Sequence, residues 1–263
     1  MSALAPSPAG PPVLELRGIS KSFGSNKAVD DVSLAIRPGE FLALIGSNGA
    51  GKTTLVNLIS GYFPADHGTL LFHGRDITRQ SINQRIRSGI ARSFQLVNLF
   101  DHLTVLDNVA LTIFSRQGKA RWFWRLADRD QAVRDEALAV LGQFGMEAHA
   151  GMPAGAISQG ERKLLDVAVA YALRPKLLFL DEPTSGVSTR EKAPIMDIIT
   201  NVVRAEGITA VVIEHDMDIV FRYSDRIVAM HQGAVLATGS PEEIRCNEQV
   251  AMTLLGTHAG DAT

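Results

Sequence analysis

One segment decides the fold of this chain: Phe41-Leu42-Ala43-Leu44-Ile45-Gly46-Ser47-Asn48-Gly49-Ala50-Gly51-Lys52-Thr53-Thr54. Its first five residues are apolar and predict a buried strand, and Leu55 to Ile59 continue with the spacing of a helix. Between them, Gly46 to Thr53 satisfy the pattern G-x-x-x-x-G-K-[ST]. A glycine-rich loop that joins a strand to the start of a helix predicts an α/β fold.

The same loop is a candidate phosphate site. Its glycines let successive amide N–H groups point inward, and the helix N-terminus adds partial positive charge. We expect Lys52 to reach the β and γ phosphates, Thr53 to offer its hydroxyl to Mg²⁺, and Thr54 to add a phosphate contact. The other interpretation is a glycine-rich turn with an incidental lysine. The predicted nucleotide-contacting residues are Gly46, Ser47, Asn48, Gly49, Ala50, Gly51, Lys52, Thr53 and Thr54.

Short apolar runs alternate with helical patterns along the rest of the chain. The runs are Leu14 to Ile19, Val32 to Ile36, Leu177 to Leu180 and Ala210 to Ile213. Near-continuous apolar strands joined through helices are typical of a parallel sheet that is covered on both faces. Ligands of such sheets bind beyond the carboxyl ends of the strands, so the functional residues are expected there.

Polar residues follow two of these strands. Asp181 and Glu182 come directly after Leu177 to Leu180, so we expect Asp181 to hold Mg²⁺ and Glu182 to orient or deprotonate the attacking water. His215 is a candidate for contact with the γ-phosphate. Gln95 either binds Mg²⁺ and senses that phosphate or simply opens a loop. Taken alone, the two acids could be solvated at a strand end, and the histidine could be an ordinary core or surface residue.

Composition excludes several function classes. The chain has 263 residues, 46% of them hydrophobic, and no apolar run reaches the roughly 18 residues that a membrane span needs. Its formal charge of -2 gives no global basic field for nucleic acid. The single cysteine, Cys246, cannot form an intrachain disulfide, and no secretory signal is evident, which favours a reducing cytosol.

The expected organisation is one main domain with flanking segments. Residues 1–12 are rich in Pro, Ala and Ser and predict a flexible leader. The main domain spans 13–245, with a helical subdomain inserted at about 96–173, and residues 246–263 form a C-terminal tail.

A serine motif precedes one helix of the insertion. Ser158 and Glu161 form an S-x-x-E capping box in front of an apolar helical pattern, and a well-capped helix explains this locally. Yet the order of phosphate loop, Gln95, serine motif, Asp-Glu strand and His215 resembles the ATP-binding cassette (ABC) ATPases, from about Val13 to Gly239.

The resemblance implies a P-loop NTPase fold of the ABC type, with an N-terminal antiparallel β region and an inserted helical subdomain. It implies ATP hydrolysis with Mg²⁺, in which Gln95 is the Q-loop glutamine, Glu182 the catalytic carboxylate and His215 the switch histidine. Phe23 resembles the adenine-stacking aromatic, although core packing explains it equally well. In this family the serine motif closes over the nucleotide of a partner cassette, so Ser158, Gln159 and Gly160 would act in trans.

Three residues depart from the wider family pattern. Gln159 replaces the middle glycine of the serine motif, Glu161 replaces its usual glutamine, and Ser188 stands where an aspartate is common. These departures bear on the geometry between paired cassettes more than on ATP binding. They lead us to expect slower hydrolysis at the composite site that uses this chain's Ser158.

Further segments resemble one class of the family, the ATPases of branched-chain amino-acid uptake. They are Arg92 to Gln95, Leu103 to Val109, Glu214 to Phe221 and Gly239 to Ile244. The class implies a second, distinct ATPase, two membrane permease subunits, and a periplasmic or extracellular solute-binding protein. This chain would be a peripheral subunit at the cytoplasmic face of the inner membrane.

Other readings remain open from the sequence. Lipid exporters carry similar cassettes, and soluble ABC ATPases act on nucleic acid, although those commonly have twin cassettes or coiled coils. A P-loop kinase would leave Ser158, Gly160 and His215 unexplained. The segment Arg121-Trp122-Phe123-Trp124-Arg125 suits either a membrane or partner contact or packing within the helical subdomain.

Overall fold

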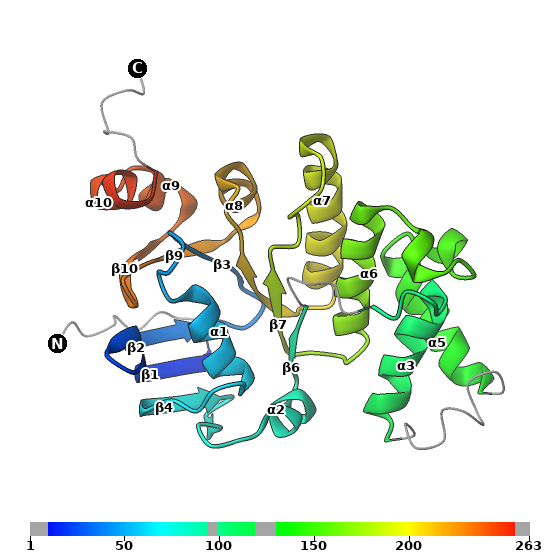
Figure 1. Cartoon of the computed structure of the whole chain (residues 1–263), viewed down its shortest axis with the longest axis horizontal. Coiled ribbons are helices and arrows are strands. Elements are labelled where there is room, and N and C mark those ends of the chain that lie inside the picture. The colour runs from blue at the N-terminus through cyan, green and yellow to red at the C-terminus, as the bar shows by residue number, and fades with distance from the viewer. Residues whose placement is uncertain (1–9, 94–98, 119–129, 256–263) are drawn as a thin grey trace.

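Two sheets form the centre of the computed structural model, which describes residues 10–93, 99–118 and 130–255 (Figure 1). One sheet is antiparallel, in the order β2-β1-β4-β5. The other has the order β10-β9-β3-β8-β7-β6 and is parallel except for its edge strand β10. The strands are β1 (Leu14–Phe23), β2 (Asn26–Ile36), β3 (Phe41–Gly46), β4 (His67–Phe72), β5 (Arg75–Asp76), β6 (Ile90–Arg92), β7 (Leu177–Asp181), β8 (Thr209–Ile213), β9 (Arg226–His231) and β10 (Ala234–Gly239).

Strand β3 shows why the parallel sheet is buried on both faces. Its side chains alternate, so Leu42 and Leu44 join one apolar cluster while Phe41, Ala43 and Ile45 join another. The first cluster lies against the antiparallel sheet and the helix after β3, and the second lies against the other helices. This arrangement confirms the predicted α/β fold with a covered parallel sheet and an antiparallel N-terminal region.

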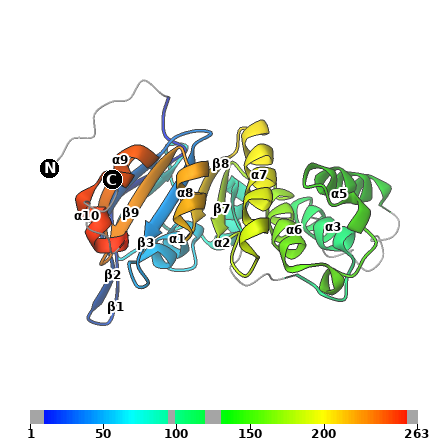
Figure 2. The ribbon, with the colours of Figure 1, turned by 90° about the horizontal axis from the view of Figure 1, so that it is seen from above.

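The helices fall into two groups, which Figure 2 separates. Three of them, α3, α5 and α6, pack on one another beside the sheet, and α7 lies between them and the strands. Their bounds agree with the predicted helix-rich segment, whereas the limits of a separate subdomain stay a prediction. The helices are α1 (Lys52–Ser60), α2 (Ile82–Ser88), α3 (Val105–Arg116), α5 (Gln131–Gln143), α6 (Gln159–Tyr171), α7 (Thr189–Ala205), α8 (Met217–Tyr223), α9 (Pro241–Arg245) and α10 (Glu248–Val250), with short 3₁₀ turns at Glu147–His149 and Ala154–Ala156.

The described part of the C-terminal tail is more ordered than its weak sequence pattern suggests. After α9, the chain forms α10 and a π-helical turn at Ala251–Leu255. The side chain of Val250 is fully buried in the core that covers the parallel sheet. Within the described residues, none of the helices has the length and apolar character that crossing a membrane requires.

Arg85 on α2 fixes the end of the helix that follows the phosphate loop. Its side chain is almost completely buried, and its guanidinium donates to the carbonyl oxygens of Leu58 and Ile59, at the last turn of α1. It also donates to the carbonyls of Gln80 and Thr78, at 3.1 and 3.0 Å. The last carbonyls of a helix lack intrahelical donors. The Leu58 carbonyl also accepts from the N–H of Gly61 at 3.3 Å, and Arg85 adds a donor to it and to the Ile59 carbonyl.

We predict that Arg85→Met lowers the free energy of unfolding by about 3 kcal/mol, since buried carbonyls would lose charge-assisted hydrogen bonds. The measurement is the urea midpoint of the purified chain. Arg87→Met, an exposed change on the same helix, is the matched control and should leave the midpoint unchanged. Equal midpoints for the two variants would contradict this account of Arg85.

Candidate active site

The phosphate loop depends on two glycines that no other residue can replace without displacing backbone. Gly51, the N-cap of α1, has a φ of 98°, and a Cβ there would lie 2.3 Å from the carbonyl oxygen of Ala28. A Cβ on Gly46 would lie 2.5 Å from the carbonyl oxygen of Met230. The loop is therefore pressed between β2 and β9, which fixes the direction in which α1 begins.

Lys52 is held inside this loop. Its Nζ donates to the carbonyl oxygens of Gly46 at 2.6 Å and Ser47 at 3.2 Å, and only 6% of the residue is exposed. Burial lowers the pKa of Lys52, and the charges of Glu182 and Asp181 act against that shift. The first residue of α1 thus carries a cation at a helix N-terminus, where an anionic group is favoured.

A cavity of about 410 Å³ brings most of the predicted residues together. Its lining comes from the end of β1, the start of β2, the phosphate loop, and the ends of β7 and β8. Predicted residues on the lining are Phe23, Asn48, Gly49, Ala50, Gly51, Lys52, Thr53, Thr54, Glu182 and His215; Asn26, Ala28 and Ile213 line it as well and were not predicted. Gly46, Ser47 and Asp181 are not part of the lining.

Glu182 and His215 face each other across this cavity. His215 Nε2 lies 3.2 Å from Glu182 Oε1, so the histidine is within hydrogen-bond reach of the carboxylate. The backbone of Glu182 adopts a φ of +50°, which is uncommon for a residue with a side chain. Its N–H donates to the carbonyl of Ile213 at 2.9 Å, which ties the turn after β7 to the end of β8.

Asp181 is buried one residue earlier and has a cationic neighbour. Arg92 Nη2 lies 2.5 Å from Asp181 Oδ2, and Arg92 Nη1 donates to Asn57 Oδ1 on α1. Among the described residues, no three His, Cys, Asp or Glu side chains gather as a metal site. The donors are one carboxylate and the exposed Thr53 hydroxyl, a set that fits Mg²⁺, because this ion is completed by phosphate oxygens and water.

Phe23 stands at the rim of the cavity and is 46% exposed, which does not fit core packing. Its ring meets the ring of Phe63 edge-on, with centroids 5.3 Å apart. Lys21 Nζ lies 5.6 Å from the Phe23 ring and pairs with Asp66. Phe23 therefore presents an exposed ring to the cavity, and Phe63, which the sequence did not single out, contacts that ring edge-on, while base stacking stays a prediction.

Comparison with known proteins places this site in a family. The family model for the ABC transporter matches residues 29–185. The chain belongs to the ABC transporter family. It is 35% identical over 253 residues to the high-affinity branched-chain amino acid transport ATP-binding protein LivG of Salmonella typhimurium, covering 93% of this chain and 98% of LivG.

Solved cassettes have the same fold. The ADP conformation of MJ1267, an ATP-binding cassette of an ABC transporter, has a TM-score of 0.84 at 29% identity and covers 94% of this chain and 99% of its own. A dimeric post-hydrolysis state of the cassette MJ0796, bound to ADP and Pi, has a TM-score of 0.73 at 25% identity, covering 87% and 98%. The predicted ABC ATPase fold is therefore confirmed, and ATP hydrolysis is the activity of this family.

The serine motif of the cassette lies outside its own nucleotide cavity. Ser158 caps α6: Ser158 Oγ accepts from the N–H of Glu161 at 3.3 Å, and Glu161 Oε2 accepts from the N–H of Ser158 at 2.7 Å. The predicted capping box is thus confirmed. His149 Nε2 lies 2.9 Å from the second oxygen of Glu161. Ser158 and Gln159 are exposed, and neither they nor Gly160 line the cavity around Lys52.

Ser188, Gln95 and the segment Arg121 to Arg125 are the remaining residues that the sequence singled out. Ser188, at the position of a common aspartate, precedes α7, and its N–H and hydroxyl both donate to Glu191 Oε2. The serine therefore still takes part in capping a helix. Gln95 and the segment Arg121 to Arg125 lie outside the described residues, so their roles stay predictions.

Glu214 is a buried carboxylate to which the sequence pattern assigned no role of its own. Its Oε1 accepts from the N–H and the hydroxyl of Thr184, at 3.0 and 2.6 Å. Its Oε2 accepts from the N–H of His215 at 3.1 Å. The loop that carries Glu182 and the loop that carries His215 are thus joined through one side chain, and a charged residue at the end of an apolar strand was the available signal.

We predict that Glu214→Gln lowers the rate of ATP turnover about tenfold, because a glutamine amide cannot accept all three hydrogen bonds and one loop must shift. ATP affinity should stay within about twofold, since Glu214 does not line the cavity. Steady-state hydrolysis and calorimetric ATP titration measure the two quantities, with exposed Glu242→Gln as the control. A parallel loss of affinity and turnover would argue against a positioning role.

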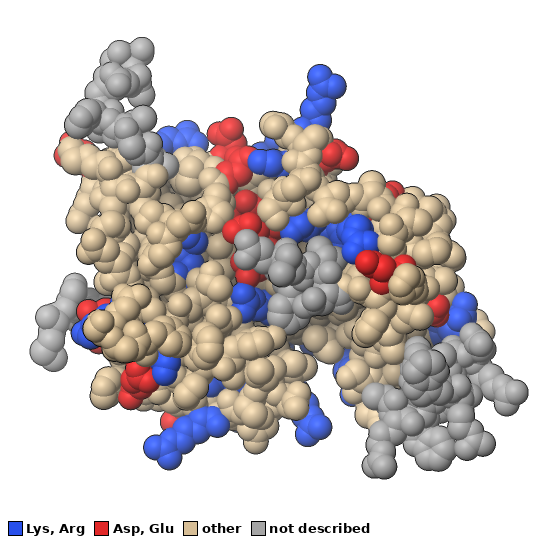
Figure 3. Space-filling view, in the orientation of Figure 1, with Lys and Arg blue, Asp and Glu red and all other residues tan. Residues whose placement is uncertain are grey.

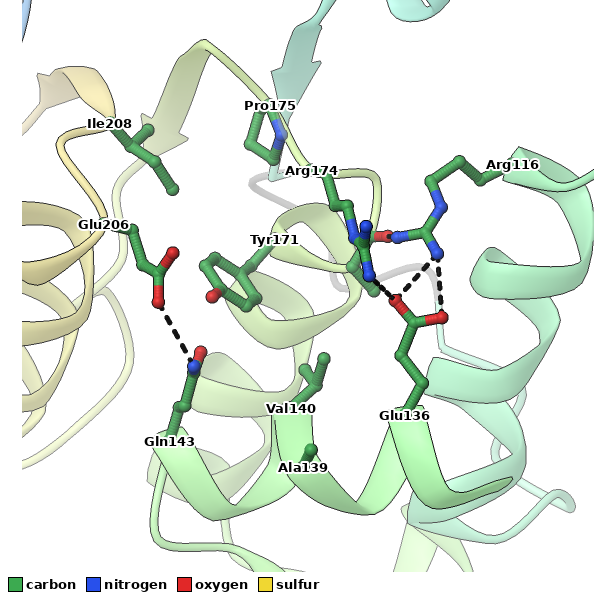
Figure 4. A pocket seen from close by; sticks show the side chains of 11 residues that line it. Arg116, Glu136, Ala139, Val140, Gln143, Tyr171, Arg174, Pro175, Glu206 and Ile208 are labelled. Carbon is green, nitrogen blue, oxygen red and sulfur yellow. Dashed lines mark hydrogen bonds and ion pairs between the residues drawn. The ribbon is translucent and has the colours of Figure 1, made fainter. Parts of the chain in front are cut away.

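A second cavity, of about 430 Å³, lies over one face of α5, beside the C-terminal ends of α3 and α6 and the residue that follows α7 (Figure 4). Glu136 accepts from Arg116 at 2.7 and 2.9 Å and from Arg174 at 2.6 Å. Burial alone would raise the pKa of Glu136. The hydrogen bonds and charges of the two guanidinium groups have the larger combined effect, so the pKa of Glu136 is lowered. One carboxylate on α5 thus binds a guanidinium from the end of α3 and another from just after α6, and the arrangement fastens these helices together.

Proposed function

We propose that this chain is the ATP-hydrolysing subunit of an importer for branched-chain amino acids or a related small solute, and that it works at the cytoplasmic face of the membrane. One observation carries the proposal: a single cavity brings Lys52, Thr53, Glu182 and His215 together in a cassette that matches LivG along nearly the whole of both chains. The cargo itself would be selected by other subunits.

The chemistry follows from the geometry of the cavity. Loop amides and Lys52 would bind the phosphates, and Glu182 would accept a proton from the attacking water while His215 Nε2 keeps that carboxylate in place. Mg²⁺, held by the Thr53 hydroxyl and by Asp181 through water, would neutralise charge on the phosphates. General-base assistance of this kind contributes about 10²–10⁴-fold to a rate.

Pairing with a second cassette is part of the proposal. The exposed start of α6, with Ser158 at its N-cap, is suited to an anionic group but stands outside this chain's own cavity. MJ0796, which has the same fold, is a dimer with ADP and Pi. A partner nucleotide would seat on Ser158, Gln159 and the Gly160 amide, and the departures in this motif favour a partner of different sequence.

Docking to two membrane permease subunits is supported by an apolar hollow beside α3 and α6. Leu99, Phe100, Leu111, Val169 and Leu173 contribute to its lining, and Phe100 is 62% exposed. Exposed apolar patches of this kind mark protein contacts. On the face in Figure 3, acidic and basic side chains are interspersed, so the described surface there offers no basic stripe for nucleic acid.

The test is an affinity pull-down from detergent-solubilised membranes with this chain as bait. A Glu182→Gln bait with ATP and Mg²⁺ would hold the closed pair. We expect two permease subunits and a second ABC ATPase, and the solute-binding protein associated with them can then be screened against leucine, isoleucine and valine. Recovery of soluble proteins alone would contradict a role in transport.

A further inference from the structure

Lys163 is a buried lysine on α6 whose role the proposed function does not explain. Only 3% of the residue is exposed, and its neighbours Leu164 and Leu165 belong to the apolar core. Removing an ammonium group from water costs several kcal/mol, whereas an apolar side chain would pack at this position without that penalty. The charge therefore needs a reason other than packing.

The hydrogen-bond partners of Lys163 lie on the turn that carries Glu182. Nζ donates to the backbone carbonyl of Glu182 at 3.1 Å and to Ser185 Oγ at 2.9 Å. Neither partner is a carboxylate, so the lysine acts as a donor that fixes the course of the backbone. No apolar residue could provide these two bonds.

Glu182 is consequently held at three points, two of them from the end of β8 and one from α6. Its N–H is bound by β8 through Ile213, its carbonyl by α6 through Lys163, and its carboxylate lies near His215. A non-glycine residue in the left-handed region persists only when its surroundings over-determine it. Without one of these bonds, the backbone at Glu182 has a more relaxed alternative, and the carboxylate would leave its position facing the cavity.

The N-terminus of the same helix, about one turn before Lys163, carries the serine motif. Ser158 is the N-cap of α6, five residues before Lys163, which corresponds to about 7.5 Å along the helix axis. The first turn also packs on the segment after Glu182: a Cβ on Gly160 would lie 3.2 Å from Ile195 Cδ1, and one on Gly186 would lie 3.7 Å from Gln159 Nε2. A shift of this helix start therefore moves Lys163 with it.

We propose that Lys163 is a positioning residue that couples the two nucleotides of the cassette pair: when a partner's nucleotide seats the start of α6, Lys163 fixes Glu182 for hydrolysis at this chain's own phosphate loop. The inference rests on the proposed pairing of cassettes. Lys163 would then connect the start of α6, which contacts the partner's nucleotide, with Glu182, which acts on the nucleotide bound by this chain.

The experiment uses the complex purified through a tag on this chain, with Lys163→Met as the main variant. Methionine keeps the length and the apolar stem but removes the donor. We expect kcat to fall at least tenfold, with KM and the affinity for ATP within about twofold. Lys163→Arg, which retains a donor, should recover part of the rate, and exposed Lys176→Met should behave as wild type.

A double-mutant cycle tests the coupling itself. If Ser158 acts on Glu182 through Lys163, Ser158→Ala should lower kcat further by less than twofold once Lys163→Met is present. Multiplicative losses would overturn the coupling, and an unchanged kcat in Lys163→Met would overturn the positioning role. If Lys163→Met does not fold, Ser185→Ala removes one of its two bonds from outside the core and should lower kcat about threefold, and no change would count against the proposal.

Failure of the pairing is detected separately. Light scattering of the Glu182→Gln chain, alone and mixed with the second ABC ATPase, with and without ATP, reports whether two cassettes pair. If they do not pair, the proposed function fails; if they pair and hydrolyse ATP while Lys163→Met keeps the wild-type rate, only this inference fails.

Discussion

Replacing Glu182 by glutamine is expected to lower ATP turnover by about 10²–10⁴-fold, the contribution of a positioned general base. Glutamine has nearly the same shape, so the turn after β7 should survive: its N–H still binds Ile213 and its carbonyl still accepts from Lys163. What is lost is the acceptor for the water proton. ATP should bind at least as tightly as before, because a negative charge near the phosphates is removed.

Single-turnover hydrolysis and equilibrium ATP binding measure these two effects for the same preparation. The control is Glu242→Gln, an exposed change far along the chain that should alter neither quantity. A Glu182→Gln enzyme that retained a tenth or more of the wild-type rate would show that another group accepts the proton. His215, 3.2 Å away, would then be the first candidate.

Residues of the site that are adjacent in sequence to a strand end or a glycine loop were predictable. The loop around Lys52 has a local pattern, and the strands that deliver Glu182 and His215 end where their apolar runs end. The cavity unites them because β3, β7 and β8 are parallel neighbours, so their carboxyl ends share one edge. The loop and strand patterns, together with the rule that ligands bind at the carboxyl edge of a parallel sheet, are therefore enough to predict the phosphate loop, Glu182 and His215 as one site.

Lys163, Glu214 and Arg92 were not recognised, because their partners lie far away in the chain. Arg92 meets Asp181 across 89 positions, and Glu214 meets Thr184 across 30. A charged residue on an otherwise apolar helix face or strand end was the only local signal, and that signal does not say which backbone group the side chain reaches. Lys163 and Glu214 are buried and Arg92 is partly buried, and each binds the end of β7 or the turn after it, so only the tertiary structure shows these contacts.

Replacing Lys52 by methionine is expected to weaken ATP binding by about 10–100-fold, since a hydrogen bond from a charged group contributes about 1.5–3 kcal/mol. The ammonium of Lys52 also binds the loop itself, through the carbonyls of Gly46 and Ser47. Its loss would remove a phosphate ligand and two bonds that shape the loop. Turnover should fall further than affinity, because charge that develops on the transferred phosphoryl oxygens would lose its nearest cation.

Isothermal titration with ATP and Mg²⁺ gives the affinity, and the urea midpoint separates the two causes. If the loop bonds dominate, Lys52→Met should lower the midpoint; if the phosphate contact dominates, the midpoint should hold while ATP binding weakens. Lys27→Met is the matched control, because Lys27 is an exposed lysine on β2, next to the same cavity, and its partner is Asp30. Equal ATP affinities for the two variants would mean that the loop amides and the helix N-terminus bind the phosphates without the lysine.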